Sequence, residues 1–281
     1  MLNSLVLFTL AFYYQPIKSM HLLKNIFRKL FRALYYRLYG GKGKEILINN
    51  KTYTVSAHVA RGIHATIDEI PLKLLLNLCK EADILFDIGA NIGLISIILS
   101  KEMKSNSKIY SFEPAHNTFR YLKDTARVQK GNAAITPVNF AVSSEVGQLQ
   151  FTDLERSTRN QITTGKQAGT ISINATTVDS FCTKNNVVPQ VIKVDIEGAE
   201  YWALLGMKQT LINNTCIVLV EIHKEYLESN GIASKMFKNF VDSINYKVFN
   251  TTGNEIDGNE IMNNPCVILA AQKPPASIFS I

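Results

Sequence analysis

The stretch that most constrains the fold is a short apolar run, residues 84–88, followed by two glycines. The run is apolar apart from Asp87, which is typical of a strand buried on both faces. Gly89 and Gly93 end it, and a helical pattern follows over residues 94–101. Residues without a Cβ let a ligand approach the backbone, and the start of a helix offers free N–H groups. The stretch therefore predicts a ligand site between a strand and a helix.

The spacing of the glycines narrows the class of ligand. A dinucleotide-binding fingerprint has three glycines in the pattern G-x-G-x-x-G, whereas this stretch has two, four residues apart. Asp87 precedes the first glycine, and its carboxylate would repel a pyrophosphate. The same carboxylate suits a cation, such as the amino group or the sulfonium of S-adenosylmethionine. Taken alone, the stretch is also compatible with an ordinary strand-to-helix turn.

A carboxylate ends the next predicted strand, residues 108–112. Glu113 follows this strand, and Pro114 stops it and opens a helix. Glu113 lies about 20 residues after Gly93, the distance at which a doubly wound sheet places an acid that binds both ribose hydroxyls. Alone, Glu113 would be interpreted as a solvated carboxylate at a strand end. Combined with the glycine stretch, it predicts a nucleoside-binding site.

A block of charged residues ends another predicted strand, residues 191–196. The block reads Lys193-Val194-Asp195-Ile196-Glu197-Gly198-Ala199-Glu200. Buried charges are costly unless they are paired, so four charged groups beside an apolar strand indicate a functional site. A purely structural network between the lysine and the carboxylates is the alternative. Lys193 and Asp195 are two residues apart and are expected to share one face.

The strand predicted over residues 216–222 ends at a histidine. Glu221 and His223 are two residues apart and would share a face of that strand. Histidine is the side chain most readily poised as a base near neutral pH. His223 is therefore the candidate base, with Glu221 orienting it or binding substrate.

The order of the elements predicts one α/β domain. Strand and helix alternate five times, and strands at residues 246–250 and 267–272 close the chain. This pattern implies a mostly parallel sheet with helices on both faces, and ligands bind outside the carboxyl ends of such strands. Five ionisable residues fall at these ends: Asp87, Glu113, Asp195, Glu221 and His223.

Several other elements are expected around this sheet. A hairpin joins residues 45–48 and 52–55, and an inserted arm joins residues 149–152 and 169–173 around a polar loop at 155–167. Asp179 is expected to cap a short helix. The remaining segments are a strand at 135–142, helices at 67–80, 115–129, 202–207 and 232–244, and a polar loop at 251–264.

The positive charge is concentrated near the N-terminus. The chain of 281 residues has a net charge of +7. Eight basic residues and no acidic residue precede Glu45, so this segment accounts for the whole positive net charge. The rest of the chain is close to neutral, which argues against a nucleic-acid partner. We therefore divide the chain into a basic segment, residues 1–44, and a domain, residues 45–281.

Residues 21–39 predict a basic amphipathic helix, because apolar residues recur at helical spacing with lysines and arginines between them. Two interpretations stay open. The helix could contact an anionic membrane surface, or it could pack against the domain or a partner, which is favoured. The apolar run at residues 2–14 is shorter than the roughly 20 residues of a membrane span, and Met20 is an alternative start of the chain.

The four cysteines are widely spaced and form no C-x-x-C pair. Apolar surroundings at three of them favour free, buried thiols. Free thiols indicate a reducing compartment. We expect a cytoplasmic protein, with peripheral contact at the inner membrane surface if residues 21–39 bind lipid. The oligomeric state is left open.

Taken together, these motifs resemble those of the FkbM-type methyltransferases, over about residues 64–250. The resemblance implies a class I methyltransferase fold, which is Rossmann-like and doubly wound, with a seven-stranded, mostly parallel sheet. It also implies S-adenosylmethionine as methyl donor and O-methylation of a hydroxyl on a sugar, glycan or polyketide-like molecule. The matching motifs are Phe86–Gly93 (FDIGANIG), Phe112-Glu113-Pro114, Ala141-Val142-Ser143, Thr177-Val178-Asp179 and the block Lys193–Glu200.

On this resemblance, the strand ends divide into cofactor and acceptor contacts. The first group would hold the amino-acid part, the ribose and the adenine of the cofactor: Asp87, Gly89, Asn91, Gly93, Glu113, Asn139, Ala141 and Asp195. Asp195 and Glu197 would border the methyl group and the acceptor. His223 would take the proton of the acceptor hydroxyl, with Asp195 and Glu221 beside it in the catalytic group.

Two other classes of function stay open. A nicotinamide-dependent oxidoreductase is disfavoured by the missing third glycine, and a non-catalytic nucleoside-binding protein would keep the fold without turnover. Oxygen ligands suit Mg²⁺, so Asp195 and Glu221 could hold a divalent metal. Because the sequence completes no ligand set, we expect none.

Overall fold

The computed structural model describes residues 43–60, 67–152, 162–163 and 170–280. The basic segment up to residue 42, with the helix expected at 21–39, lies outside these residues. So does most of the loop expected at 155–167. Among the described residues, no helix combines the length and the apolar character needed to cross a bilayer.

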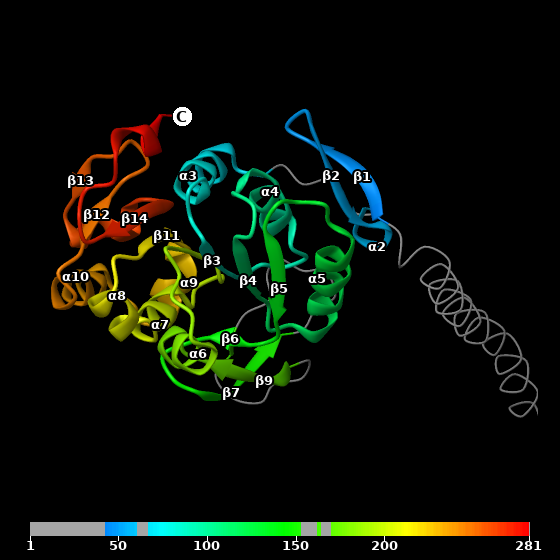
Figure 1. Cartoon of the computed structure of the whole chain (residues 1–281). Coiled ribbons are helices and arrows are strands. Elements are labelled where there is room, and N and C mark those ends of the chain that lie inside the picture. Colours follow the sequence, from blue (N-terminus) through cyan, green and yellow to red (C-terminus); the bar gives the residue numbers. More distant parts are fainter. Residues whose placement is uncertain (1–42, 61–66, 153–161, 164–169, 281) are drawn as a thin grey trace, which may run out of the picture.

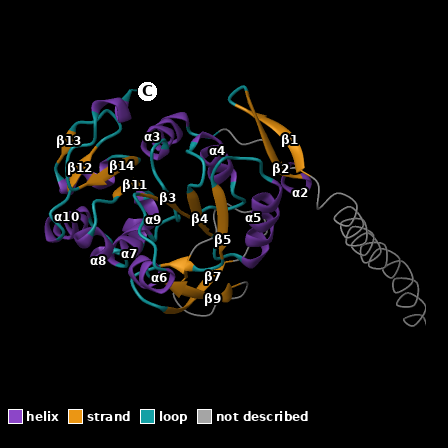
Figure 2. Ribbon diagram, viewed as in Figure 1, coloured by secondary structure: helices purple, strands orange, loops and turns teal. Residues whose placement is uncertain are grey.

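The described part of the chain contains a central sheet of eight strands (Figures 1 and 2). The first five strands in the spatial order are parallel, and β14 runs antiparallel to both of its neighbours. The predicted seven-stranded, mostly parallel sheet is confirmed, and the short β13 adds an eighth strand. The order is β5 (Ala134–Val138), β4 (Lys108–Phe112), β3 (Ile84–Ile88), β10 (Val191–Val194), β11 (Ile217–Glu221), β14 (Cys266–Ala270), β12 (Lys247–Phe249) and β13 (Glu255–Ile256).

Helices cover both faces of this sheet. On one face, α3 (Glu69–Cys79) and α4 (Leu94–Glu102) pack through apolar side chains such as Leu75 and Leu99. The opposite face is covered by the helices that follow the inserted arm, and α5 packs against β2 and β5. These further helices are α5 (His116–Val128), α6 (Val178–Asn185), α7 (Glu200–Leu205), α8 (Lys208–Asn213), α9 (Lys224–Ser229) and α10 (Ser234–Ser243).

The central strands are buried on both faces, as their apolar composition predicts. In β3, Leu85 belongs to the core under α3 and α4, whereas Phe86 and Ile88 belong to the opposite core. Asp87 therefore projects to the same face as Leu85. Lys193 occupies the matching position on the neighbouring strand β10. A charged pair is thus built into the α3–α4 face of the sheet.

The predicted hairpin is confirmed as β1 (Gly43–Ile48) and β2 (Lys51–Ser56). Its turn needs only Asn49 and Asn50, which have φ angles of 47° and 60°. Positive φ at both central residues is the geometry of a two-residue hairpin turn, and asparagine tolerates it. The short helix α2 (Ala57–Ala60) follows the hairpin.

The prediction of a single strand over residues 135–142 is wrong. β5 ends at Val138, and the chain then crosses to a second sheet, which it enters at β6 (Ala141–Val142). The side chain of Asn139 donates to the carbonyl oxygens of Glu113 and Pro114, at 2.8 and 3.1 Å, and so holds the crossing to the end of β4. The predicted arm is confirmed, and its sheet has the order β6, β9 (Thr170–Thr176), β7 (Gly147–Thr152) and β8 (Ile162–Thr163).

The predicted cap at Asp179 is also wrong. The hydroxyl of Thr177 caps α6 by accepting from the backbone N–H of Ser180 at 2.9 Å. Asp179 instead accepts from the backbone N–H groups of Gln209 and Thr210 at the start of α8.

The loop expected at residues 251–264 contains β13 and a 3-10 helix, η1 (Gly258–Asn263). A second 3-10 helix, η2 (Ala276–Phe279), lies near the C-terminus.

Candidate active site

A cavity opens at the carboxyl ends of β3, β4 and β10, the edge of the sheet that the sequence indicates. Apolar side chains form most of its wall, and a few carboxylates project into it. Such a surface suits a ligand with both flat apolar and polar parts. The lining residues come from residues 88–95 without Gly93, from 112–114, 140–142 and Phe151, and from Lys193, Asp195, Ile196, Glu197 and Ala199.

The first glycine of the predicted stretch shapes this cavity. Gly89 has a φ angle of +83°, and a Cβ at this position would overlap the backbone oxygen of Asp195. The backbone N–H groups of Gly89 and Ala90 both donate to the carbonyl oxygen of Phe112, at 3.1 and 2.9 Å. The end of β3 is therefore held tightly between the ends of β4 and β10, which only a glycine permits.

The second glycine plays another part. Gly93 has a φ angle of +86° and does not line the cavity. A Cβ there would lie 2.7 Å from Cδ1 of Leu122 and 3.3 Å from Cγ2 of Thr125, both on α5. Gly93 therefore lets α4 begin close to α5. The structure therefore does not bring Gly93, for which a ligand contact was predicted, to the cavity wall.

Glu113 is 6% exposed and lines the cavity. Its two carboxylate oxygens accept from the backbone N–H groups of Asn91, at 3.0 Å, and Ala115, at 2.9 Å. Glu113 is thus fixed by its own neighbourhood with its carboxylate at the cavity wall.

Asn91 lines the cavity next to Glu113 and adopts a left-handed conformation, with φ of 50°. Its side-chain oxygen accepts from the backbone N–H of Ile92 at 2.8 Å. Asn139 does not line the cavity and acts through its hydrogen bonds to residues 113 and 114. Ala141 does line it, beside Phe140 and Phe151.

Asp87 lies under the cavity and does not line it. Its side chain is completely buried, and its oxygens are 3.3 Å from Nζ of Lys193 and 2.5 Å from the hydroxyl of Ser96. Lys193 also lies 3.2 Å from Asp195, which does line the cavity. Burial alone would lower the pKa of Lys193, but Asp195, Asp87 and Glu221 together raise that pKa above its usual value. Lys193 is therefore a fixed cation that links Asp87 to the cavity wall.

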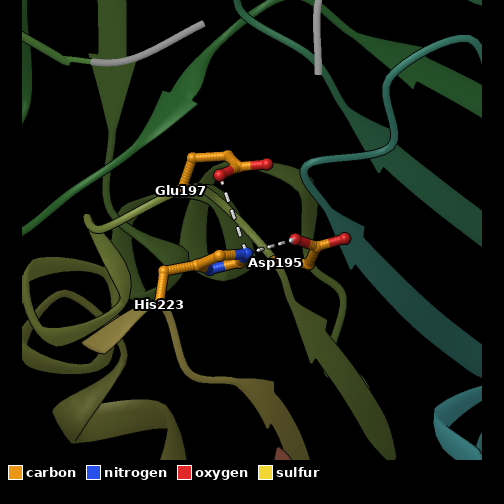
Figure 3. A group of neighbouring side chains, drawn as sticks. All are labelled: Asp195, Glu197 and His223. Carbon is orange, nitrogen blue, oxygen red and sulfur yellow. Dashed lines mark ion pairs between the residues drawn. The ribbon is translucent and has the colours of Figure 1, made fainter. Parts of the chain in front are cut away.

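The ring of His223 lies beside Asp195 and Glu197, two carboxylates that line the cavity, although His223 itself is not among the described lining residues (Figure 3). Its Nε2 atom is 3.8 Å from Asp195 and 3.7 Å from Glu197. Its other ring nitrogen, Nδ1, is 2.7 Å from Oε1 of Glu200, a completely buried side chain on α7. The orienting contact expected from Glu221 is thus made by Glu200, and Nε2 is the nitrogen that faces the cavity wall.

The carboxylates around His223 make its ring unusually basic. Burial would lower the pKa of His223, but the hydrogen bond and charge of Glu200 outweigh burial, and Glu197 and Asp195 act in the same direction. They raise this pKa to about 9. His223 is therefore an imidazolium at neutral pH, whereas an unperturbed histidine would be mostly neutral.

Glu221 ends β11 and does not line the cavity. Burial and the charge of Asp195 raise the pKa of Glu221 to about 7, although Lys193 and His223 oppose the shift. Glu221 is therefore close enough to Asp195, Lys193 and His223 to interact with their charges. A carboxyl group with a pKa near 7 can exchange a proton under physiological conditions.

Three of the site residues could also hold a cation. Ligand atoms of Asp195, Glu197 and His223 all lie within 4.8 Å of one another. From the sequence, Asp195 and Glu221 were considered as metal ligands, and only Asp195 belongs to this group of three. A metal at this position would have to displace the proton on Nε2 of His223.

Two features of the site were missed by sequence reasoning. Glu200 was seen only as the last residue of the charged block, and its contact with His223 joins elements 23 residues apart. Phe140 and Phe151 belong to the crossing and the inserted arm, and no motif indicated that they reach the cavity. Phe140 is 37% exposed, and an exposed aromatic side chain at a cavity can be recognised only from the structure.

Residues 87–248 match the methyltransferase FkbM domain family and make up more than half of the chain. The hexuronic acid methyltransferase AglP of Haloferax volcanii is 28% identical over 183 residues, which cover 60% of this chain and 72% of the relative.

Solved methyltransferase structures also match the chain, at low sequence identity. The FkbM methyltransferase of Methylobacillus flagellatus has a TM-score of 0.38 at 14% identity, over 67% of this chain. This chain spans less than half, 43%, of that relative's length. The O-methyltransferase of Bacillus cereus in complex with SAH has a TM-score of 0.39 at 12% identity, over 76% of this chain and 85% of that chain.

The family match covers both motif blocks, from Asp87 through Lys193–Glu200, and extends past His223. All of the cavity's described lining residues fall within this match, as do strands β4, β5, β10 and β11 of the central sheet. The chain is therefore a class I methyltransferase and belongs to the FkbM methyltransferase family.

Proposed function

We propose that the protein transfers a methyl group from S-adenosylmethionine to a hydroxyl group of a sugar or glycan. The observation that carries this proposal is the position of His223, held by the buried Glu200 with Nε2 toward two carboxylates of the cavity wall. A hydroxyl group is a poor nucleophile until it loses its proton, so its methylation needs a base. The relative AglP is named for a hexuronic acid, which supports a saccharide acceptor.

The cavity fits the cofactor that the family implies. Glu113 lines the cavity, is fixed by two backbone N–H groups, and would accept hydrogen bonds from the ribose hydroxyls. Phe140, Ala141 and Phe151 offer an apolar surface for adenine. Asp195 and Glu197 also line the cavity and would place negative charge beside the sulfonium of the cofactor. When bound, the cofactor supplies an electrophilic methyl group.

His223 acts as the base in this proposal. With its proton on Nδ1 shared with Glu200, the neutral ring presents Nε2 to the acceptor hydroxyl and takes its proton. Asp195 and Glu197, both within 4 Å of Nε2, then stabilise the imidazolium that forms. Glu221 contributes through its charge and not through contact with the ring.

A hexuronic acid offers two kinds of oxygen nucleophile, its hydroxyl groups and its carboxylate. A carboxylate is ionised at neutral pH and needs no base. The Glu200–His223 pair therefore favours a hydroxyl acceptor and an ether product. Polyketide-like hydroxyls remain within the same reaction class.

The two alternatives left by the sequence predict other behaviour. A nicotinamide enzyme has the sheet order 3-2-1-4-5-6, whereas here the antiparallel β14 is inserted between β11 and β12. A non-catalytic nucleoside-binding protein would bind cofactor without turnover. Substitution of His223 would not change such a protein's function.

We also assign the protein to a reducing compartment, the cytoplasm, because all four cysteines are free and buried. The near-neutral charge beyond residue 44 supports a small-molecule or glycan partner and not a nucleic acid. Peripheral membrane contact through residues 21–39 remains a separate proposal, as does the boundary at residue 44.

Calorimetry of the full chain tests the cofactor. We expect saturable binding of S-adenosylmethionine and S-adenosylhomocysteine and none of NADH. Glu113→Gln should weaken binding by about 10- to 100-fold, the size expected for lost hydrogen bonds to a charged group. Glu102→Gln, at a partly exposed residue outside the cavity, is the matched control. Binding of NADH alone, or unchanged binding in Glu113→Gln, would contradict the proposal.

A further inference from the structure

A second cavity adjoins the proposed cofactor cavity, and Glu197 and Ala199 line both. Resting on the proposed function, we infer that this second cavity binds the acceptor as a neutral hexose ring, stacked on Trp202. Its other walls come from residues 143–149, which follow β6 and include the start of β7, and from the end of α9 at residues 229 and 230. The inference goes beyond the reaction itself, because it assigns the acceptor subsite and the charge of the sugar.

Trp202 supplies the apolar surface of this cavity. It lies on α7, is half-buried, and packs against the main core as well as lining the cavity. It is also the only tryptophan in the chain. One face of a pyranose ring carries mainly C–H groups, and placing it on an indole buries apolar surface from both partners.

The cavity that Trp202 lines also has polar side chains in its walls. Ser144, Gln148 and Asn230 line the same cavity and offer hydroxyl and amide groups. Asn230 contacts the carbonyl oxygen of Gly198 at 3.5 Å, which ties the end of α9 to the wall between the two cavities. A sugar has hydroxyl groups around its ring, so this mixture of one flat apolar surface and several small polar groups matches its chemistry.

The charge of the cavity selects against an anionic sugar. Glu145 and Glu197 both line it, and neither lysine nor arginine occurs among its described lining residues. A uronate in this cavity would place a third carboxylate beside the other two. Because like charges repel each other across a binding surface, a neutral hexose is favoured over its uronic acid.

Glu197, which lines both cavities, connects the proposed sugar subsite to the proposed base, His223. Glu197 has a left-handed backbone conformation, with φ of 52°, and Gly198 follows with φ of 97°. A Cβ at Gly198 would overlap Cβ of Tyr226 on α9, so this turn is fixed against that helix. The Glu197 carboxylate lies 3.7 Å from Nε2 of His223. A sugar hydroxyl that reaches Glu197 from the second cavity is therefore close to the proposed base.

Trp202 makes the inference directly measurable, because all tryptophan fluorescence of the protein comes from this one side chain. The full chain is titrated with methyl glucoside, methyl galactoside, methyl mannoside and methyl glucuronide, with and without S-adenosylhomocysteine. We expect a saturable change for at least one neutral hexoside, with a Kd at least about tenfold lower than that of the glucuronide.

Two variants separate charge from stacking. Glu145→Lys should narrow or reverse the preference for the neutral sugar, whereas Glu260→Lys, at an exposed position on η1, should leave it unchanged. Trp202→Leu keeps an apolar side chain against the core but removes the ring. It should raise the KM for the acceptor about tenfold while the Kd for S-adenosylmethionine stays the same.

The inference is overturned if no neutral hexoside changes the fluorescence, if the glucuronide binds as tightly as the neutral sugars, or if Trp202→Leu leaves the acceptor KM unchanged. Failure of the proposed function has a different signature. The wild-type chain would then bind no S-adenosylmethionine or would transfer no methyl group to a hydroxyl, while the saccharide titration of the cofactor-free protein would still report on the subsite.

Discussion

The Nδ1 atom of His223 lies 2.7 Å from Oε1 of Glu200, a side chain with no exposure to solvent. This contact joins the end of the central strand β11 to the first turn of α7. It fixes the ring so that Nε2 faces Asp195 and Glu197. It also makes the ring basic, since burial alone would lower the pKa of His223 and Glu200 raises it.

The pH dependence of activity should therefore follow His223. A base must be deprotonated to act, so kcat/KM should rise with pH through about 9, the pKa of His223 in the free enzyme. Glu200→Gln removes the charge that raises this pKa and should move the rise to lower pH. His223→Ala should lower kcat about 10²- to 10⁴-fold and abolish the rise. The same pH profile in wild type and Glu200→Gln would contradict the assignment.

The same group predicts a pH dependence of stability. The pKa of His223 is raised from 6.5 to about 9 on folding. Its contribution to the free energy of unfolding is then complete below about pH 6.5 and is lost as the pH rises through about 9. Thermal unfolding of wild type and His223→Gln over this range should show a fall in Tm for the wild type that the variant lacks. Parallel curves would mean that the folded state does not favour the imidazolium.

The fold was largely predictable because the signal lies within each element. The central strands, such as residues 84–88, are runs of apolar residues bounded by glycine, proline or charge, and they begin and end within about two residues of the prediction. The strand expected over 135–142 failed because its break at Asn139 depends on hydrogen bonds to residues 113 and 114 on another strand.

The site was predictable as a set of strand ends and not as a set of contacts. Asp87 and Gly93 belong to the most distinctive motif, yet neither lines the cavity. Asp87 pairs with Lys193 across the sheet, and Gly93 fits against α5. Both partners are set by how distant elements pack, which periodicity along the chain does not contain. Glu200 was overlooked for the same reason.

The pair formed by Lys193 and Asp87 should be important for stability. Lys193 is 1% exposed, and its removal would leave Asp87 as an uncompensated buried charge. Lys193→Met should lower the free energy of unfolding by about 3–5 kcal/mol in urea denaturation. Lys104→Met, which breaks an exposed ion pair with Asp83, should cost about 0–1 kcal/mol.

A double variant tests whether the buried charge is the cause. Asp87→Asn combined with Lys193→Met removes both charges and should be more stable than Lys193→Met alone. If the double variant loses the sum of the two single effects, the two residues act independently, and the network assigned to them is wrong.

Metal removal should leave activity intact. The protonated His223 already supplies a positive charge beside Asp195 and Glu197, the residues that would otherwise hold a cation with it. Methyl transfer should therefore proceed at the same rate before and after treatment with EDTA. A loss of activity that Mg²⁺ or Mn²⁺ restores would show that this trio is a metal site.

Hydroxyl methylation is tested by transferring a labelled methyl group from S-adenosylmethionine to saccharides and then treating the product with alkali. An ether survives alkali, whereas a methyl ester is hydrolysed. We expect an alkali-stable label on the sugar, formed by the wild-type chain and nearly absent with His223→Ala. An alkali-labile label that His223→Ala forms equally well would contradict hydroxyl methylation by a histidine base.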